Sequence, residues 1–231
     1  MRHEAFEIEV ERDPPGNVRA VWTWPDPELE GAPAVLLAHG AGLPHDAPFM
    51  VAIAEGLGRR GLPVLRFDYP YATRMAREGR RFPPNRMPEL EDTHRRALAE
   101  LNRRLPERPV LLAGKSMGGR VSSLIAAAGA EAVGCAFLGY PLHPPKKPQN
   151  LRVDHFPDLR LPCLFLQGTR DALAPLESLR PHLETIPARV ELHVVEGADH
   201  GYELPKRMGR APEDVLDELS GTIASFASSL V

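Results

Sequence analysis

The 231-residue chain is long enough for one domain with a full hydrophobic core, and no low-complexity stretch or long polar linker divides it. Its formal net charge of −3 is small and its acidic and basic residues are interspersed, which argues against nucleic acid or an anionic membrane as the main partner. No apolar run reaches the roughly 20 residues that cross a bilayer, and residues 1–4 lack the apolar segment of a secretory signal. We therefore expect a cytoplasmic protein whose partner is a small molecule, and the oligomeric state stays open.

The chain opens with a strand pattern. Residues 6–11 and 18–24 alternate apolar and polar side chains on either side of turn-forming residues at 13–17. This pattern is typical of an antiparallel hairpin, which we expect at one edge of a sheet.

Short aliphatic runs then alternate with helical patterns. This alternation predicts a mostly parallel sheet with right-handed crossovers, and hence a three-layer α/β/α sandwich whose functional groups lie at the carboxyl ends of the strands. The expected strands are 34–38, 64–67, 110–113, 133–138, 163–166 and 190–195, and the expected helices are 49–60, 88–104, 119–128, 176–185 and 211–230.

A glycine-rich segment follows the first of these strands at residues 39–42. Backbone N–H groups in such a segment can stabilise a developing oxyanion. We favour the N–H of Ala41 for this role, with Gly42 as the alternative, and we interpret His39 as structural.

Residues 69–86 combine Tyr69 with arginines at 74, 77, 80, 81 and 86. Tyr69 is a candidate for substrate binding. The arginines could form a basic rim that selects acidic or phosphorylated acyl substrates. Alternatively they belong to a solvated loop and pair with nearby glutamates, which is the interpretation we favour.

The segment Gly114–Gly119 breaks a buried strand into a helix. In a G-x-S-x-G elbow, small residues flank a serine that stands exposed at the carboxyl end of the sheet. Ser116 is therefore the candidate nucleophile, and the N–H of Met117 is the second candidate oxyanion donor. Lys115 is a poor candidate for the base, because adjacent residues on a sharp turn point in different directions.

After the strand at 133–138, Tyr140 and His143 are candidates to line the pocket. The proline-rich segment from there to residue 161 leaves room for a loop but not for a cap of several helices. We thus expect a shallow, open pocket that favours small or flexible esters.

Asp171 and His200 each follow a later strand. A serine hydroxyl needs a base that accepts its proton, and a carboxylate behind the imidazole holds the required tautomer. We predict His200 as general base and Asp171 as the carboxylate, although Asp171 could instead cap the next helix. Asp68 and Asp199 are weaker candidates for the acid.

Neither cysteine suggests a functional site. Cys135 and Cys163 lie in apolar, strand-like runs, where we interpret them as reduced core residues. Their spacing predicts no metal site, and the chemistry above needs no cofactor.

The chain resembles the α/β-hydrolase superfamily over essentially its whole length, through residues 39–42, 114–119, 168–171 and 197–200. Residues 86–91, 114–120 and 138–145 resemble more narrowly a branch of small dienelactone-hydrolase-like proteins. That branch is similar to a testis-expressed hydrolase-like protein and to a subunit of a histone acetyltransferase complex.

The resemblance implies a serine hydrolase with Ser116, Asp171 and His200 as triad, acting on small carboxylic esters or thioesters. Relatives often have proline where this chain has Ala172. Alternatives are an interaction protein that keeps the fold with weak catalysis, or a small peptidase.

Overall fold

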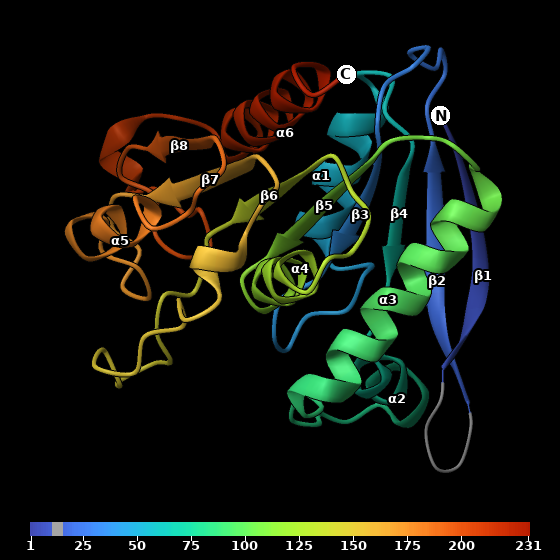
Figure 1. Ribbon diagram of the computed structural model, residues 1–231, viewed down its shortest axis with the longest axis horizontal. Coiled ribbons are helices and arrows are strands. Elements are labelled where there is room, and N and C mark those ends of the chain that lie inside the picture. The colour runs from blue at the N-terminus through green and yellow to red at the C-terminus, as the bar shows by residue number, and fades with distance from the viewer. Residues whose placement is uncertain (11–15) are drawn as a thin grey trace.

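The computed structural model describes residues 1–10 and 16–231. Its centre is one eight-stranded sheet with the strand order β1-β2-β4-β3-β5-β6-β7-β8 (Figure 1). The strands are β1 Arg2–Val10, β2 Gly16–Trp24, β3 Ala34–Ala38, β4 Val64–Phe67, β5 Val110–Lys115, β6 Gly134–Leu138, β7 Cys163–Gly168 and β8 Val190–Val195. The α-helices are α1 Pro48–Gly58, α2 Pro70–Glu78, α3 Met87–Arg104, α4 Met117–Ala127, α5 Leu176–Leu183 and α6 Pro212–Ser228, with short 3₁₀ helices at Phe156–Asp158 and Lys206–Met208.

The N-terminal hairpin is antiparallel and forms one edge of the sheet, as the alternating pattern predicts. β1 pairs with β2 from Arg2 opposite Trp24 to Val10 opposite Gly16. The predicted turn at 13–17 falls largely outside the described residues. Trp22 is fully buried and its ring stacks on that of Trp24 at a centroid distance of 4.6 Å. The hairpin is thus anchored to the core by large aromatic surfaces.

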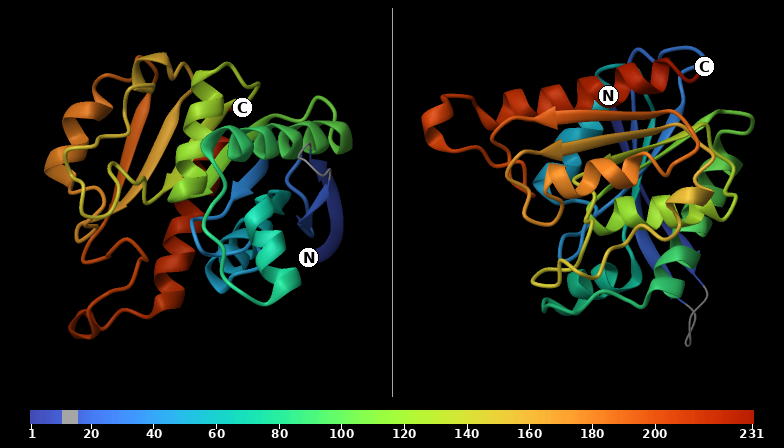
Figure 2. Two further views of the ribbon diagram at one scale, coloured as in Figure 1. Left: turned by 90° about the horizontal axis from the view of Figure 1, so that it is seen from below. Right: turned by 60° about the vertical axis from the view of Figure 1, so that its left-hand side comes forward.

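From β3 onward the strands pair in parallel, and both faces of the sheet are covered. Along β3, Leu36 packs into the core on the face of α3 and α4, and Leu37 into the core on the face of α1 and α6. Figure 2 shows α6 on one side of the sheet and α3 and α4 on the other. Burial on both faces is the reason these strands read as continuous apolar runs instead of alternating ones. The predicted three-layer sandwich is confirmed.

One element differs from the sequence prediction. Residues 70–78, interpreted as part of a loop, form helix α2. Pro70 occupies its first turn, where a missing N–H is harmless, and Gly79 ends it in the left-handed conformation at φ 66°. Only the first turn of α2 is buried, from Pro70 to Thr73, and its nine residues are polar on average, so it lacks the repeated apolar positions of a longer helix packed along the core.

The segment after β6 carries no cap domain in the described structure. Between Leu138 and Cys163, the 3₁₀ turn at Phe156–Asp158 is the regular element present. The carboxyl ends of β5, β7 and β8 therefore stay accessible. Among the described helices, none has the length and apolar character needed to cross a membrane.

Candidate active site

Ser116 occupies the sharp turn between β5 and α4. Its backbone lies at φ 50° and ψ −114°, a region that residues other than glycine rarely adopt. The turn brings backbone segments into direct contact: a Cβ on Gly114 would lie 2.4 Å from the carbonyl carbon of Gly118, and one on Gly118 would lie 2.5 Å from the carbonyl oxygen of Ala38. The glycines of the motif are therefore required by space.

The structure brings Ser116, His200 and Asp171 together. His200 Nε2 lies 2.8 Å from Ser116 Oγ, and His200 Nδ1 lies 2.7 Å from Asp171 Oδ2. Because a carboxylate only accepts, the Nδ1–H donates to Asp171 and leaves Nε2 as the acceptor for the serine hydroxyl proton. These groups come from the ends of three strands, and 84 residues separate Ser116 from His200. The arrangement can carry out nucleophilic catalysis with a general base.

Asp171 is held by several donors besides His200. Its Oδ1 accepts the N–H of Leu173 at 2.8 Å, and its Oδ2 also accepts from the side-chain amide of Gln167. Gln167 in turn accepts the N–H of Tyr140 at 3.0 Å, and the carboxylate is nearly fully buried. Gln167 thus positions the acid, a role that sequence reasoning missed, since a glutamine inside an apolar strand has no distinctive signal.

The two alternative acids are engaged elsewhere. Asp199 Oδ1 accepts the N–H groups of Gly201 and Glu203 within its own turn. Asp68 Oδ1 lies 2.8 Å from His45 Nδ1, and its Oδ2 accepts from Arg19 at 2.8 Å. Burial alone would raise the pKa of Asp68, but the hydrogen bond from His45 and the charge on that ring lower it to about 2. Asp68 belongs to a buried ion cluster, not to the triad.

Lys115 points away from Ser116. Its Nζ donates to the main-chain carbonyl of His200 and lies 5.2 Å from the ring centroid of Tyr202. Burial lowers the pKa of Lys115 to about 8, against the opposing charges of Asp171 and Asp199. The side chain therefore supports the His200 loop from behind.

Ala41 and Met117 both line the pocket that contains Ser116. Within residues 1–10 and 16–231, no hydrogen bond occupies the N–H of either residue. The N–H of Gly42, in contrast, donates to Tyr71 Oη at 3.2 Å. Ala41 is therefore better placed than Gly42 to serve as an oxyanion donor beside Met117.

The loop that carries Ala41 is fixed from two sides at Gly40. Tyr71 Oη donates to the carbonyl of Gly40 at 3.2 Å, and His39 Nδ1 lies 2.8 Å from the same oxygen. His39 Nε2 accepts the N–H of Tyr69 at 3.0 Å, so Nδ1 carries the proton and donates to Gly40. Burial lowers the pKa of His39 to about 4, which keeps this ring neutral. His39 is structural, in agreement with its predicted role.

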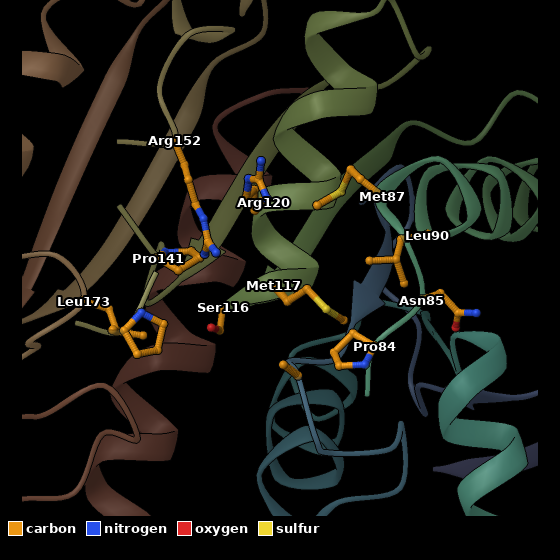
Figure 3. A pocket seen from close by; sticks show the side chains of 12 residues that line it. Pro84, Asn85, Met87, Leu90, Ser116, Met117, Arg120, Pro141, Arg152 and Leu173 are labelled. Atoms are coloured by element: carbon orange, nitrogen blue, oxygen red, sulfur yellow. The ribbon is translucent and has the colours of Figure 1, made fainter. Parts of the chain in front are cut away.

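Figure 3 shows the pocket around Ser116. Its volume is about 290 Å³. One part of its wall is apolar, and the polar side chains that reach it come from Asn85, Ser116, Arg120 and Arg152. The apolar part comprises Ala41, Pro84, Met87, Leu90, Met117, Pro141, Pro145 and Leu173.

Tyr69, Tyr140 and His143, which the sequence suggests as substrate contacts, do not line this pocket. Tyr69 is fully buried with its hydroxyl 3.1 Å from His94 Nδ1, and the Tyr140 hydroxyl donates to the carbonyl of Arg152 at 2.6 Å. His143 is 6% exposed, with its Nδ1 2.9 Å from the carbonyl of Pro144. These side chains follow strand ends but turn into the core beneath the loops.

The predicted arginine rim does not border the pocket either. Arg74 and Arg80 both pair with Glu78, at 2.6 and 2.9 Å, and Arg77 pairs with Glu7 at 3.3 Å. This pairing is the favoured alternative of the sequence analysis. The cations at the pocket are instead Arg120 and Arg152, which that analysis missed. The spacing of four residues from Ser116 could have drawn attention to Arg120, but Arg152 has no such signal.

Cys135 and Cys163 are buried and form no disulfide, and they lie opposite each other on the neighbouring strands β6 and β7. In the described part of the chain, no group of three or more His, Cys, Asp or Glu side chains is arranged to hold a metal ion.

Comparisons with known proteins agree with the architecture. A family model described as alpha/beta hydrolase domain matches residues 31–228. A dienelactone hydrolase from Anabaena variabilis is 19% identical, with 100% of this chain and 97% of that chain covered and a TM-score of 0.71. An esterase domain of a Rhodothermus marinus protein is 18% identical, with 98% of each chain covered and a TM-score of 0.71. An α/β serine hydrolase without lid from Xanthomonas campestris is 20% identical, with 96% and 95% covered and a TM-score of 0.66. At these identities the solved structures show likeness of fold.

Proposed function

The chain belongs to the alpha/beta hydrolase family, whose model spans residues 31–228, and we propose that it is a serine hydrolase that cleaves small carboxylic esters or thioesters. The observation that carries the proposal is the unbroken hydrogen-bonded series from Ser116 through His200 to Asp171, with distances of 2.8 and 2.7 Å. Similar solved structures described as esterases and hydrolases support the same activity. Within the family we place the chain in the small dienelactone-hydrolase-like branch, on the sequence segments 86–91, 114–120 and 138–145.

Acylation begins when Ser116 Oγ attacks the carbonyl carbon and its proton passes to His200 Nε2. Asp171 holds the Nδ1–H tautomer and stabilises the imidazolium that forms. The carbonyl oxygen gains negative charge and accepts the N–H groups of Met117 and Ala41, each of which contributes about 3 kcal/mol of transition-state stabilisation. The C–O or C–S bond then breaks, and His200 returns the proton to the departing alcohol or thiol.

Deacylation repeats these steps with water. Water adds to the acyl carbon and gives a proton to His200, the bond to Ser116 breaks, and the proton returns to Oγ. Deacylation thus yields a carboxylic acid and the free enzyme, and the whole cycle consumes only substrate and water.

The size of the pocket limits the substrate. A cavity of about 290 Å³ holds a short acyl chain and a small leaving group. The accessible strand ends favour small, flexible compounds. In this proposal residues 1–231 act as one α/β-hydrolase domain.

A fluorophosphonate probe tests the nucleophile. We expect it to label the purified protein and expect Ser116→Ala to abolish labelling, because the probe reacts only with an activated serine. Hydrolysis of short p-nitrophenyl esters should fall by about 10⁴-fold or more in the same variant. Ser178→Ala, which removes an exposed hydroxyl on α5, is the matched control and should behave as the parent protein.

Two outcomes contradict the proposal. Labelling that survives Ser116→Ala would move the nucleophile elsewhere. A folded parent protein that neither reacts with the probe nor turns over any ester would favour an interaction protein that keeps the fold.

A further inference from the structure

We propose that Arg120 and Arg152 form a subsite beside Ser116 that binds an anionic group of the substrate. The substrates are then small esters or thioesters that also carry a carboxylate or phosphate group. This inference rests on the proposed function and narrows its substrate class. Figure 3 shows the two arginine side chains next to each other above Ser116, with Met87, Leu90, Pro84 and Asn85 to their right. Both arginines and Ser116 line the same cavity.

The elements that carry the arginines hold them there. Arg120 follows Ser116 by one turn of α4, so its side chain projects from the same side of the helix as the nucleophile. The backbone of Arg152 is fixed at both polar groups: its N–H donates to Leu142 at 2.8 Å, and its carbonyl accepts from Tyr140 Oη at 2.6 Å. The subsite is therefore built into the fold.

Among the described residues, no Asp or Glu oxygen lies within 4.0 Å of Arg120 or Arg152, whereas Arg19, Arg60 and Arg104 all form ion pairs. Arg120 Nε is buried and makes no hydrogen bond in the described structure. A buried donor without an acceptor is costly, and a bound anion would supply the missing acceptor.

The positive charges of Arg120 and Arg152 also repel each other. Burial and then the nearby charge of Arg120 lower the pKa of Arg152. Burial and the charge of Arg120 lower the pKa of the nearby His155 to about 4, against the opposing charges of Asp154 and Asp158, so this ring is neutral at pH 7. The other lining residues contain no carboxylate. An anionic group of the substrate is therefore the natural counter-charge for this pair.

The geometry of guanidinium selects the class of anion. Its planar fork matches the paired oxygens of a carboxylate or phosphate and binds them with charge-assisted hydrogen bonds. Because the same cavity of about 290 Å³ must also hold the reacting carbonyl, the anion lies on a short substrate, close to the scissile bond. Arg74 and Arg77 of α2 and the following Arg80 play no part, since they pair with glutamates and do not line the pocket.

Two isosteric substrate pairs test the proposal. Monomethyl succinate is compared with methyl 4-methylpentanoate, and 3-acetoxypropanoate with 3-methylbutyl acetate, with acid release followed at constant pH. The members of each pair differ only by a carboxylate in place of an isopropyl group, on the acyl side in the first pair and on the alcohol side in the second. We expect kcat/KM to favour the anionic member of at least one pair by about 30-fold or more.

The variants Arg120→Gln and Arg152→Gln should each lower that preference by about 10-fold, because each removes charge-assisted hydrogen bonds. Arg152→Lys, which keeps the charge but loses the fork, should recover only part of it. Arg80→Ala is the matched control, since Arg80 is an exposed arginine paired with Glu78, and should keep the full preference. If Arg120→Gln fails to fold, Arg152→Gln decides, because Arg152 lies in a loop outside the helices and strands.

A binding measurement separates this proposal from the hydrolase activity. Calorimetric titration of the Ser116→Ala variant with monomethyl succinate and with methyl 3-phosphonopropanoate should show binding that Arg152→Gln weakens about 10-fold, and comparison of the two ligands distinguishes a carboxylate from a phosphonate, which stands in for a phosphate group. Arginine-dependent binding without any ester turnover would sustain the subsite and refute the hydrolase. If the esters are turned over without preference for the anionic member of either pair, and if binding does not depend on Arg120 or Arg152, the subsite is refuted and the hydrolase proposal is retained.

Discussion

Ser116 keeps a left-handed backbone conformation that its surroundings must impose, at a cost of about 1–3 kcal/mol. The contacts that impose it run through the neighbouring glycines. Gly118 packs against the carbonyls of Ala38 and His39 with no space for a side chain. Ser116, the proposed nucleophile, and the loop of the proposed oxyanion donor are thereby held in a fixed relative position.

Gly118→Ala should therefore impair catalysis through a steric clash, because an added Cβ would lie 2.5 Å from the carbonyl oxygen of Ala38. We expect the rate of fluorophosphonate labelling to fall by about 100-fold and the free energy of unfolding to fall by about 1–3 kcal/mol. Gly129→Ala, at φ 84° with nothing within 4 Å of the new Cβ, is the comparison. It should cost about 1 kcal/mol of stability and leave labelling intact. Equal labelling in the two variants would show that the elbow tolerates the added atom.

The positions of Ser116, Asp171 and His200 could be predicted at this scale because each follows a strand within a short recognisable segment. The contacts of Gln167 and Arg152 could not. Their roles depend on side chains that meet only in three dimensions, and neither residue stands in a characteristic sequence. The same limit explains Tyr69 and Tyr140, whose direction after the strand end depends on the packing beneath the loops.

At the level of elements, α2 and the loop after β3 act together. Tyr71 lies in the first, buried turn of α2, and its hydroxyl bridges the carbonyl of Gly40 and the N–H of Gly42. The intervening Ala41 lines the pocket, and its N–H makes no hydrogen bond in the described part of the chain. Helix α2, which the sequence did not predict, thus fixes the glycine-rich loop at residues 39–42, which the sequence did predict.

Tyr71→Phe removes this bridge and keeps the ring. We expect kcat to fall by about 10-fold with KM little changed, because a mobile oxyanion donor loses mainly transition-state stabilisation. Tyr69→Phe is the control: it removes an equally buried hydroxyl, which contacts His94 instead of the loop. It should lower stability without lowering kcat. A rise of KM alone in Tyr71→Phe would instead assign the hydroxyl to ground-state binding.

The strands were predictable because aliphatic runs covered on both faces leave little ambiguity, and the fully buried β3 has the predicted bounds at Ala34–Ala38. Helix α2 was not, because its nine residues bury only one turn and expose two arginines, Arg74 and Arg77. Short polar helices are stabilised by their ends and by tertiary contacts, which periodicity does not record.

Across the whole molecule, stability depends on histidines that are buried in the neutral state. Burial lowers the pKa of His39 to about 4, of His94 to about 3 and of His155 to about 4. In the unfolded chain the pKa of histidine is about 6.5. Between these values the unfolded state binds more protons than the folded state, so stability falls as pH falls.

We expect His39 and His94, which are fully buried, each to remove about 2 kcal/mol from the free energy of unfolding between pH 7 and pH 5, and the partly exposed His155 to remove less, with urea unfolding as the measurement. His94→Gln should flatten this dependence, whereas His3→Gln, at an exposed position of β1, should leave it unchanged. Asp68, with its pKa lowered to about 2, adds a separate loss only below about pH 4. A free energy of unfolding that stays constant from pH 7 to pH 5 would contradict the buried neutral state.

The stacked pair of Trp22 and Trp24 has a consequence for refolding experiments. These are the two tryptophans of the chain, and both lie on β2 at one end of the sheet, whereas Asp171 and His200 follow β7 and β8 at the other end. Tryptophan fluorescence therefore monitors the ordering of the sheet around β2, and recovered reactivity of Ser116 monitors completion of the sheet around β7 and β8. The molecule carries two independent reporters, so a delay between the optical signal and the catalytic one would reveal the order in which the sheet assembles.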